Sequence, residues 1–242
     1  MRHARLWRSL LSKNFDSIIL TCEHAGNAVP QAYASLFDGA ANILATHRGW
    51  DIGAFAVASG LAASLHSPLH VSKTTRLLID LNRSLHVKGV WSDWSKELDT
   101  AAKNVIIERY YHPYRRSVED HLMQLVAKEK RVLHLSLHSF TPVFNGETRN
   151  ADVGILYDPK RAFEAQLARS LFAAVRAADG SLRVRRNYPY VGYADGFTTH
   201  LRRKLPETCY AGIEIETKQD EITTPVGQRR FIEIFTRAIQ SL

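Results

Sequence analysis

The sequence Val132-Leu-His-Leu-Ser-Leu137 is an apolar run interrupted only by single polar residues, and His138-Ser139-Phe140 follows it directly. Short runs of this kind are typical of strands that are buried in a sheet. Four similar runs occur elsewhere in the chain, at residues 17–21, 77–81, 153–157 and 211–215. We therefore expect a central sheet built from these five segments.

Helical segments lie between the predicted strands. Apolar or Ala-rich patterns with helical character occur at residues 52–65, 100–128, 162–178 and 226–242. Because strands that alternate with helices are typical of α/β proteins, the sequence predicts an α/β fold, a three-layer sandwich with a mixed, mostly parallel central sheet.

Two segments depart from these patterns. Pro113 interrupts the long helical pattern, so we expect a break between Tyr110 and Tyr114 rather than one continuous helix. Residues 186–206 are rich in Gly, Tyr and Arg and follow neither period. They are expected to form a long functional loop.

The composition is that of an ordinary globular protein. The 242 residues are 45% hydrophobic, which is enough for a sizeable core, and we expect one domain spanning 1–242. The two cysteines, Cys22 and Cys209, form no C-x-x-C pair. A disulfide framework and a thiolate zinc site are therefore not expected, and both thiols are expected to be reduced.

The first 13 residues are basic, and their apolar residues occur only in pairs, unlike the core of a signal peptide. No stretch approaches the roughly 18 apolar residues that a membrane span requires. We expect a cytoplasmic protein without a membrane partner. The sequence leaves the oligomeric state open.

The chain carries a net charge of +8. The densest basic segment, residues 183–204, includes aromatic residues but no nucleic-acid-binding motif. We therefore expect no nucleic acid partner and interpret the charge as favouring an anionic small molecule, a carboxylate substrate.

Polar residues follow several predicted strands, where ligand sites of α/β sheets lie. His24 and His138 each come just after an apolar run. Two histidines and a carboxylate are the parts of an open catalytic zinc site, in which water takes the fourth position. Taken alone, each histidine also fits a structural role. The carboxylate is expected to be Asp51, which also fits a helix N-cap, with Glu23 and Asn27 as alternatives.

Two carboxylates, Glu214 and Glu216, alternate with isoleucines in the last predicted strand and share one face of it. One of them near a metal fits a general base that takes a proton from water, although a solvated sheet face has the same pattern. Asn82 and Arg83 follow the run at 77–81, and the planar guanidinium of Arg83 suits a substrate carboxylate. Arg76, just before the same run, fits substrate or oxyanion binding, or a structural cation.

Seven stretches of sequence occur together in one order: Thr21-Cys-Glu-His-Ala-Gly-Asn-Ala-Val-Pro30, His47-Arg-Gly-Trp-Asp-Ile-Gly-Ala54, Arg76-Leu-Leu-Ile-Asp-Leu-Asn-Arg-Ser84, Tyr111-His-Pro-Tyr114, His134-Leu-Ser-Leu-His-Ser-Phe-Thr-Pro142, Ala151-Asp-Val-Gly-Ile-Leu-Tyr157 and Gly212-Ile-Glu-Ile-Glu-Thr-Lys218. This ordered set resembles the N-formylglutamate amidohydrolase family. The fold of this family resembles that of the zinc carboxypeptidases.

The resemblance implies roles for individual residues. In the carboxypeptidase-like order, His24 and His138 are metal ligands, Asn82 and Arg83 hold the substrate carboxylate, and Glu216 rather than Glu214 is the base. The carboxypeptidase His-x-x-Glu pattern reads His24-Ala-Gly-Asn27 here, which is why Asp51 is taken as the other ligand. The stretch after Glu216, Thr-Lys-Gln-Asp220, also departs from the Glu-Ile-Arg-Asn-Asp pattern of relatives, which indicates that substrate contacts differ there.

The predicted activity is hydrolysis of the amide of an N-formyl or N-acyl amino acid, such as N-formylglutamate, by zinc-activated water. Two other functions stay open: carboxypeptidase-like cleavage of short peptides, and a basic binding protein with a degenerate site. Other divalent ions also suit a site of two histidines and a carboxylate.

Overall fold

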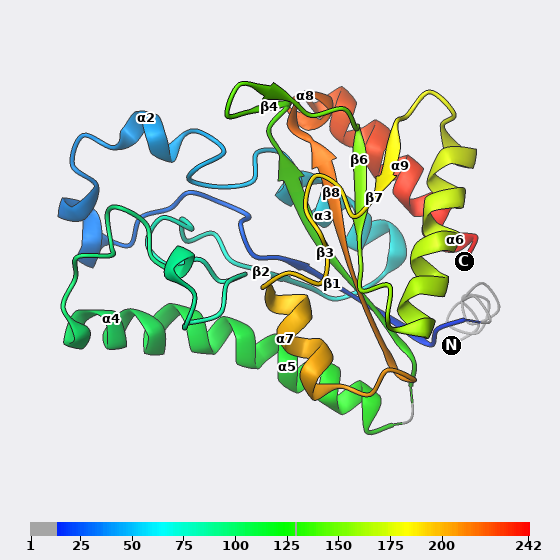
Figure 1. Cartoon of the computed structure of the whole chain (residues 1–242), viewed down its shortest axis with the longest axis horizontal. Coiled ribbons are helices and arrows are strands. Elements are labelled where there is room, and N and C mark those ends of the chain that lie inside the picture. The colour runs from blue at the N-terminus through cyan, green and yellow to red at the C-terminus, as the bar shows by residue number, and fades with distance from the viewer. Residues whose placement is uncertain (1–13, 129) are drawn as a thin grey trace.

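Six strands form the central sheet, in the order β2-β1-β3-β8-β6-β7 (Figure 1). Their bounds are β1 Ser17–Cys22, β2 Leu69–Val71, β3 Val132–Phe140, β6 Val153–Leu156, β7 Val184–Arg186 and β8 Tyr210–Lys218. The structure, a computed structural model, describes residues 14–128 and 130–242. Strands β2, β1, β3 and β8 run parallel, whereas β6 is antiparallel to β8 and parallel to β7. The predicted mixed, mostly parallel sheet is confirmed.

Strands β3 and β8 are the long central pair of the sheet. All nine residues of β3 are buried, and the apolar character of the sequence around His138 follows from this burial. The two strands pair in register from Val132 with Tyr210 to Phe140 with Lys218, so that His138 lies opposite Glu216. Because the strands are parallel, both residues lie at the carboxyl edge of the sheet.

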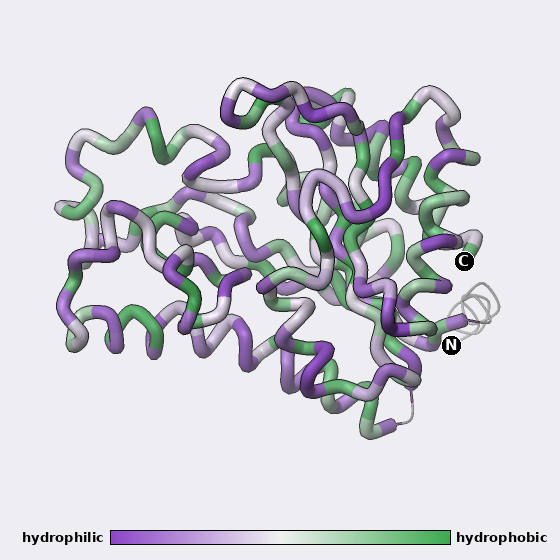
Figure 2. The backbone as a smooth tube through the Cα atoms, viewed as in Figure 1, coloured by the Kyte–Doolittle hydropathy of each residue, from purple (hydrophilic) through white to green (hydrophobic). Residues whose placement is uncertain are grey.

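Helices cover both faces of the sheet (Figure 1). On one face, α3 (Ala54–Leu65), α6 (Ala162–Ala178) and α9 (Pro225–Gln240) share the largest apolar core with the sheet. On the other face, α5 (His112–Val126) and α7 (Phe197–Lys204) pack through a second cluster that includes β-strand residues. Hydrophobic and hydrophilic stretches alternate along these helices (Figure 2), as expected for helices with one buried side. The three-layer arrangement is therefore confirmed.

The apolar run at residues 77–81 does not form the predicted strand. It is a chain of turns in which Leu78 N donates to the Thr75 carbonyl and Asp80 N to the Val90 carbonyl. Its leucines and isoleucine are nevertheless buried, in an apolar cluster of their own beside the sheet. Burial rather than strand pairing therefore accounts for the apolar sequence, because a short apolar run looks the same in both cases.

The expected break at Pro113 is also wrong. Helix α4 (Thr100–Ile106) continues through a π-helical turn, η3 (Ile107–Tyr111), into α5, so that the chain stays helical from 100 to 126. A π turn takes up one extra residue, so Pro113 lies at the start of the next α-helical segment, where its missing N–H costs little.

The segment 186–206 contains a helix that the sequence pattern does not reveal, α7, in addition to the expected loop. The remaining short elements are η1 (Gln31–Phe37), α2 (Ala41–Leu44), η2 (Lys88–Val90), the hairpin of β4 (Val143–Phe144) and β5 (Glu147–Thr148), and α8 (Gln219–Ile222). The expectation about the first 13 residues lies outside the described residues. Within residues 14–128 and 130–242, no helix has the length and apolar character needed to cross a membrane.

Candidate metal centre and substrate pocket

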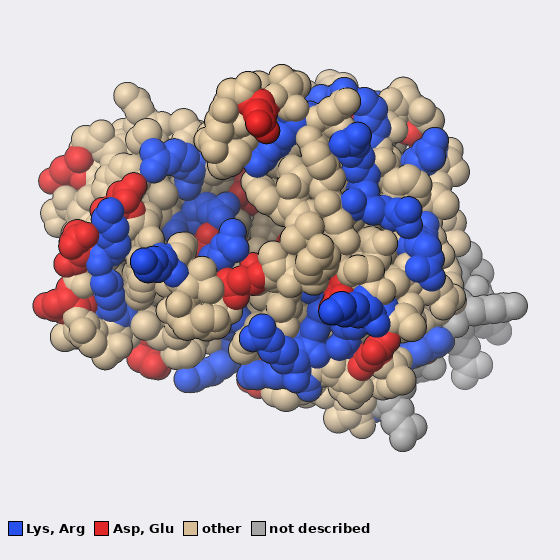
Figure 3. Space-filling view, viewed as in Figure 1, with Lys and Arg blue, Asp and Glu red and all other residues tan. Residues whose placement is uncertain are grey.

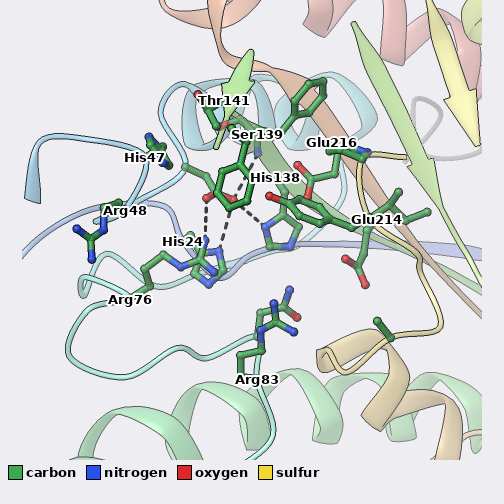
Figure 4. Close-up of a pocket in the computed structure, with 18 of the residues that line it drawn as sticks. His24, His47, Arg48, Arg76, Arg83, His138, Ser139, Thr141, Glu214 and Glu216 are labelled. Atoms are coloured by element: carbon green, nitrogen blue, oxygen red, sulfur yellow. Dashed lines mark hydrogen bonds and ion pairs between the residues drawn. The ribbon is translucent and has the colours of Figure 1, made fainter. Parts of the chain in front are cut away.

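A cavity of about 620 Å³ opens at the carboxyl edge of β1, β3 and β8 (Figure 4). His24, Asp51 and His138 lie in its wall together with Arg76, Arg83 and both glutamates of β8. In the space-filling view the hollow is bordered by several Lys and Arg side chains (Figure 3). The sequence-predicted residues are thus brought together around one cavity.

Backbone contacts bring Asp51 to the sheet edge. Its N–H donates to the carbonyl of His24 over 3.0 Å, which joins the loop before α3 to the loop after β1. Two residues later, Gly53 has φ 83°, and a Cβ there would lie 2.3 Å from the carbonyl oxygen of Ile222. Only glycine fits this position. Because Gly53 holds the N-cap position of α3 without a side-chain cap, the carboxylate of Asp51 does not serve as the cap.

Three buried donor groups converge on one point. Oδ2 of Asp51 lies 2.8 Å from Nδ1 of His138 and 3.4 Å from Nδ1 of His24. The two imidazole rings are 5.3 Å apart and tilted, not stacked. Candidate ligand atoms of the three residues lie within 4.8 Å of one another. Two imidazoles and one carboxylate at this spacing fit a catalytic zinc site with three protein ligands.

In each histidine, the ring nitrogen that does not face Asp51, Nε2 (the outer nitrogen), lies near a second carboxylate. Nε2 of His24 lies 2.7 Å from Oδ1 of Asp80, and Nε2 of His138 lies 3.3 Å from Oε2 of Glu23. Metal-binding histidines commonly donate their other ring N–H to a carboxylate in this way, which fixes the ring and makes the inner nitrogen a better donor. The geometry therefore leaves Nδ1 of both rings to face Asp51.

Charge around the three residues favours a cation. Burial opposes ionisation, but hydrogen bonds with Asp51 and Glu23 hold the pKa of His138 well above its ordinary value. Burial also works to raise the pKa of Asp51, yet His24 and His138 hold it well below its usual range. The buried carboxylates thus create a negative potential at the histidines, and this potential would stabilise a bound divalent cation.

The alternative ligands lie elsewhere. Glu23 sits behind His138, where it accepts hydrogen bonds from Ser136 Oγ over 2.8 Å and from the Tyr114 hydroxyl over 3.1 Å. Asn27 donates to the carbonyl of Leu44 and is not among the residues that line the cavity.

The two glutamates of β8 both line the cavity, as strand alternation predicts, but their surroundings differ. Oε1 of Glu214 accepts a hydrogen bond from Thr198 Oγ1. Oε2 of Glu216 is buried and has no hydrogen-bond partner among residues 14–128 and 130–242. Burial raises the pKa of Glu216 to about 7. A carboxyl group with an unused oxygen and a pKa near neutrality is suited to exchanging protons with water.

Arg83 and Asn82 lie in the cavity wall, although no strand precedes them. One guanidinium nitrogen of Arg83 donates to the Asp195 carbonyl over 3.1 Å, which anchors the side chain. Oδ1 of Asn82 accepts from the Phe197 N–H over 2.7 Å. The remaining guanidinium donors of Arg83 suit a carboxylate in the cavity.

Arg76 bridges two acidic side chains. It donates to Oδ2 of Asp80 over 2.6 Å and to Oδ1 of Asp51 over 3.4 Å. Burial acts to lower the pKa of Arg76, but the two carboxylates raise it further above its already high ordinary value. These contacts favour the structural alternative for this residue, a cation that orients the carboxylates.

The sequence did not indicate the roles that several residues of the site have in the structure. Asp80 and Glu23 stand within quoted motifs, but nothing in the sequence pairs them with the histidines. His47, Arg48, Phe144 and Tyr190 also line the cavity. They come from loops that are distant in the chain, and only the fold brings them together.

A known protein family matches most of the chain. The model of the family described as N-formylglutamate amidohydrolase matches residues 16–223. The chain belongs to this family.

Two solved structures share the fold of this chain. A gene product of Agrobacterium tumefaciens is 28% identical, with a TM-score of 0.81 over 96% of this chain and 91% of that one. The N-formylglutamate amidohydrolase of Ralstonia eutropha JMP134 is 17% identical, with a TM-score of 0.71 over 95% and 94% of the two chains. No curated protein gives a significant match. The family makes this chain a hydrolase.

Proposed function

We propose that this protein is a metal-dependent amidohydrolase that cleaves the amide of an N-formyl or N-acyl amino acid such as N-formylglutamate, and that residues 1–242 form one catalytic domain. The observation that carries the proposal is the convergence of His24, Asp51 and His138 in a cavity that also contains Arg83 and Glu216. We place its action in the cytoplasm, as the sequence suggests.

His24, Asp51 and His138 would hold one divalent ion, and zinc suits two imidazoles and a carboxylate. Bound there, zinc would bring the pKa of a water molecule towards neutrality and polarise the substrate carbonyl. Asp80 and Glu23 keep the two imidazoles oriented through their outer nitrogens. The fit of the donor set and the negative potential around it support this assignment.

Glu216 is the proposed base. Its unpaired oxygen accepts a proton from the attacking water, whose oxygen forms a bond with the amide carbon. The same carboxyl group then gives the proton to the amide nitrogen as the C–N bond breaks, so that a carboxylic acid and a free amino acid leave. The pKa of about 7 suits a group that both takes up and releases a proton.

Arg83 and Asn82 position the substrate by its carboxylate. Fixing one end of the substrate in the cavity aligns its amide with the base, an effect that can contribute several powers of ten to the rate. The positive charge around the hollow, with Arg48, Arg76 and Arg83 in its wall, favours the arrival of an anion (Figure 3).

The test measures metal content and hydrolysis on the same purified protein. We expect one zinc per chain and metal-dependent release of the amine from N-formyl or N-acyl amino acids. Release of amino acids from short peptides instead would transfer the function to a carboxypeptidase-like hydrolase. A protein that binds no stoichiometric metal and hydrolyses neither substrate class after zinc addition is a binding protein, which contradicts the proposal.

A further inference from the structure

One wall of the cavity is apolar and comes from the end of β3, the β4–β5 hairpin and the loop before α7. Phe140 and Phe144 belong to β3 and the β4–β5 hairpin, and Tyr190 and Val191 belong to the loop before α7. Phe144 and Tyr190 are each 45% exposed although both line the cavity. Large apolar side chains that stay exposed beside a cavity are typical of a ligand-binding surface.

The exposure is concentrated at this rim. Nine large hydrophobic residues are exposed in the described part of the chain, and five of them lie on the hairpin or the loop 188–195. These five are Val143, Phe144, Tyr190, Val191 and Tyr193. Three of the five, Phe144, Tyr190 and Val191, line the cavity, and a random scatter of surface hydrophobics would not gather them there.

Arg149 ties the two loops together. Its guanidinium lies 4.5 Å from the ring centre of Phe144 and 4.9 Å from that of Tyr190, and it donates to the Tyr190 hydroxyl over 3.0 Å. Its Nη1 is buried without a hydrogen-bond partner in the described residues. The apolar wall is thus held in place by contacts of its own.

The wall lies on the acyl side of a bound substrate. Figure 4 shows Arg83 on one side of His24 and His138, and Thr141, which leads into the hairpin, on the other. A substrate whose carboxylate is held by Arg83 and whose carbonyl lies near the two histidines therefore directs its acyl group towards Phe144 and Tyr190. A formyl group ends in a single hydrogen and would leave this wall without a contact.

The size of the cavity supports a larger acyl group. At about 620 Å³ it falls within the range usual for drug-sized ligands, whereas N-formylglutamate has only about a dozen non-hydrogen atoms. An anionic acyl group would need unpaired cations. The two cations that line this side of the cavity already have partners, because Arg48 lies 3.7 Å from Asp93 and Arg76 binds Asp51 and Asp80. Arg149 does not line the cavity, and its guanidinium lies against the rings of Phe144 and Tyr190.

We infer that the preferred substrate is an N-acyl amino acid with a bulky aromatic or other apolar acyl group, which packs on Phe144 and Tyr190. This inference rests on the proposed amidohydrolase function. It makes the hairpin and the loop 188–195 the part of the protein that determines acyl specificity.

The experiment compares kcat/KM of the zinc-loaded enzyme for N-formylglutamate, N-phenylacetylglutamate and N-succinylglutamate, which share the amino acid and differ in the acyl group. We expect the phenylacetyl substrate to exceed the other two by about tenfold or more, the scale of one buried apolar contact. A preference for formyl or succinyl overturns the inference but leaves the proposed function intact. Hydrolysis of none of the three contradicts the proposed function itself.

Phe144→Ala should lower the ratio of the phenylacetyl to the formyl value by about tenfold. Val143→Ala is the matched control, because Val143 adjoins Phe144 in β4 and does not line the cavity, so it should leave the ratio unchanged. An equal ratio in Phe144→Ala and the wild type contradicts the inference.

A second measurement needs no variant. Phenylacetate should inhibit the wild-type enzyme at concentrations about tenfold lower than formate, and equal inhibition contradicts the inference.

Discussion

Nε2 of His24 lies 2.7 Å from Oδ1 of Asp80, and both side chains are buried. The contact fixes the imidazole so that its other nitrogen, Nδ1, faces Asp51. Asp80 is held in turn by Arg76, which donates to its second oxygen over 2.6 Å. In the proposed metal site, Asp80 would therefore act through His24 as a positioning residue.

Asp80→Asn should weaken zinc binding by about 10- to 100-fold, because the ring of His24 loses the carboxylate that orients it. A competition titration with a chromophoric chelator measures the affinity. Asp93→Asn removes the same charge from an exposed position and is the matched control. Equal affinities of Asp80→Asn and the wild type would show that His24 does not depend on Asp80.

Glu216→Gln should keep the metal and lose about 100- to 10,000-fold in turnover, since an amide cannot take a proton from water. Single-turnover rates and metal content, measured together, check this. Glu214→Gln is the natural comparison, because Glu214 already accepts a hydrogen bond from Thr198 and should lose less. If Glu216→Gln keeps a near-normal rate while Glu214→Gln does not, the base role belongs to Glu214.

The central strands of the sheet could be predicted because they are buried on both faces. Strand β3 is fully buried, and its apolar run marks it clearly in the sequence. The edge strands β2 and β7 have three residues each, too few to show any period. The run at 77–81 has the same composition as a buried strand but is buried by a local cluster, and only the tertiary structure distinguishes the two.

The two histidines could be proposed because they are reactive residues near strand ends, where parallel strands bring them to one edge. Asp51 follows no strand, and it was proposed because the carboxypeptidase His-x-x-Glu pattern is absent. The supporting carboxylates, Asp80 and Glu23, are paired with the histidines only by the fold. The apolar wall of the cavity could not be predicted either, because only the fold brings its residues together. Phe144 and Tyr190 are separated by more than forty residues, and contacts with Arg149 join them.

Arg83→Ala should raise the KM of carboxylate substrates by about tenfold or more, because the charge-assisted hydrogen bonds to the carboxylate are lost. Steady-state kinetics on an N-acyl amino acid and on its C-terminal amide separate this effect from a general loss of structure. The amide derivative should be affected much less. An unchanged KM for the carboxylate substrate means that Arg83 does not bind it.

His134, which is not a candidate metal ligand, gives a pH prediction. It is fully buried in β3, where its ring nitrogens lie 2.9 Å from Thr21 Oγ1 and 2.8 Å from the Tyr210 hydroxyl. Burial lowers the pKa of His134 to about 4, although Glu23 opposes the shift. In the unfolded chain the histidine has an ordinary pKa of about 6.5.

The sign of the effect follows from proton uptake. Below pH 6.5 the unfolded chain binds a proton at His134, whereas the folded protein does not bind this proton until about pH 4. Proton uptake therefore favours the unfolded chain, and the free energy of unfolding decreases as the pH falls through this window. Between pH 7.5 and 5 the loss from this residue amounts to about 2 kcal/mol.

His134→Gln replaces the titrating ring by a neutral side chain that can still hydrogen-bond. The variant should be less stable than the wild type at pH 7.5, because the packing around the ring is disturbed, yet it should lose about 2 kcal/mol less between pH 7.5 and 5. Urea unfolding of the metal-free proteins at both pH values measures this difference, since other titrating groups contribute alike to both. His86→Gln, at an exposed position, is the control and should follow the wild type. Parallel stability losses in His134→Gln and the wild type would mean that His134 is not the buried neutral group that makes the fold sensitive to acid.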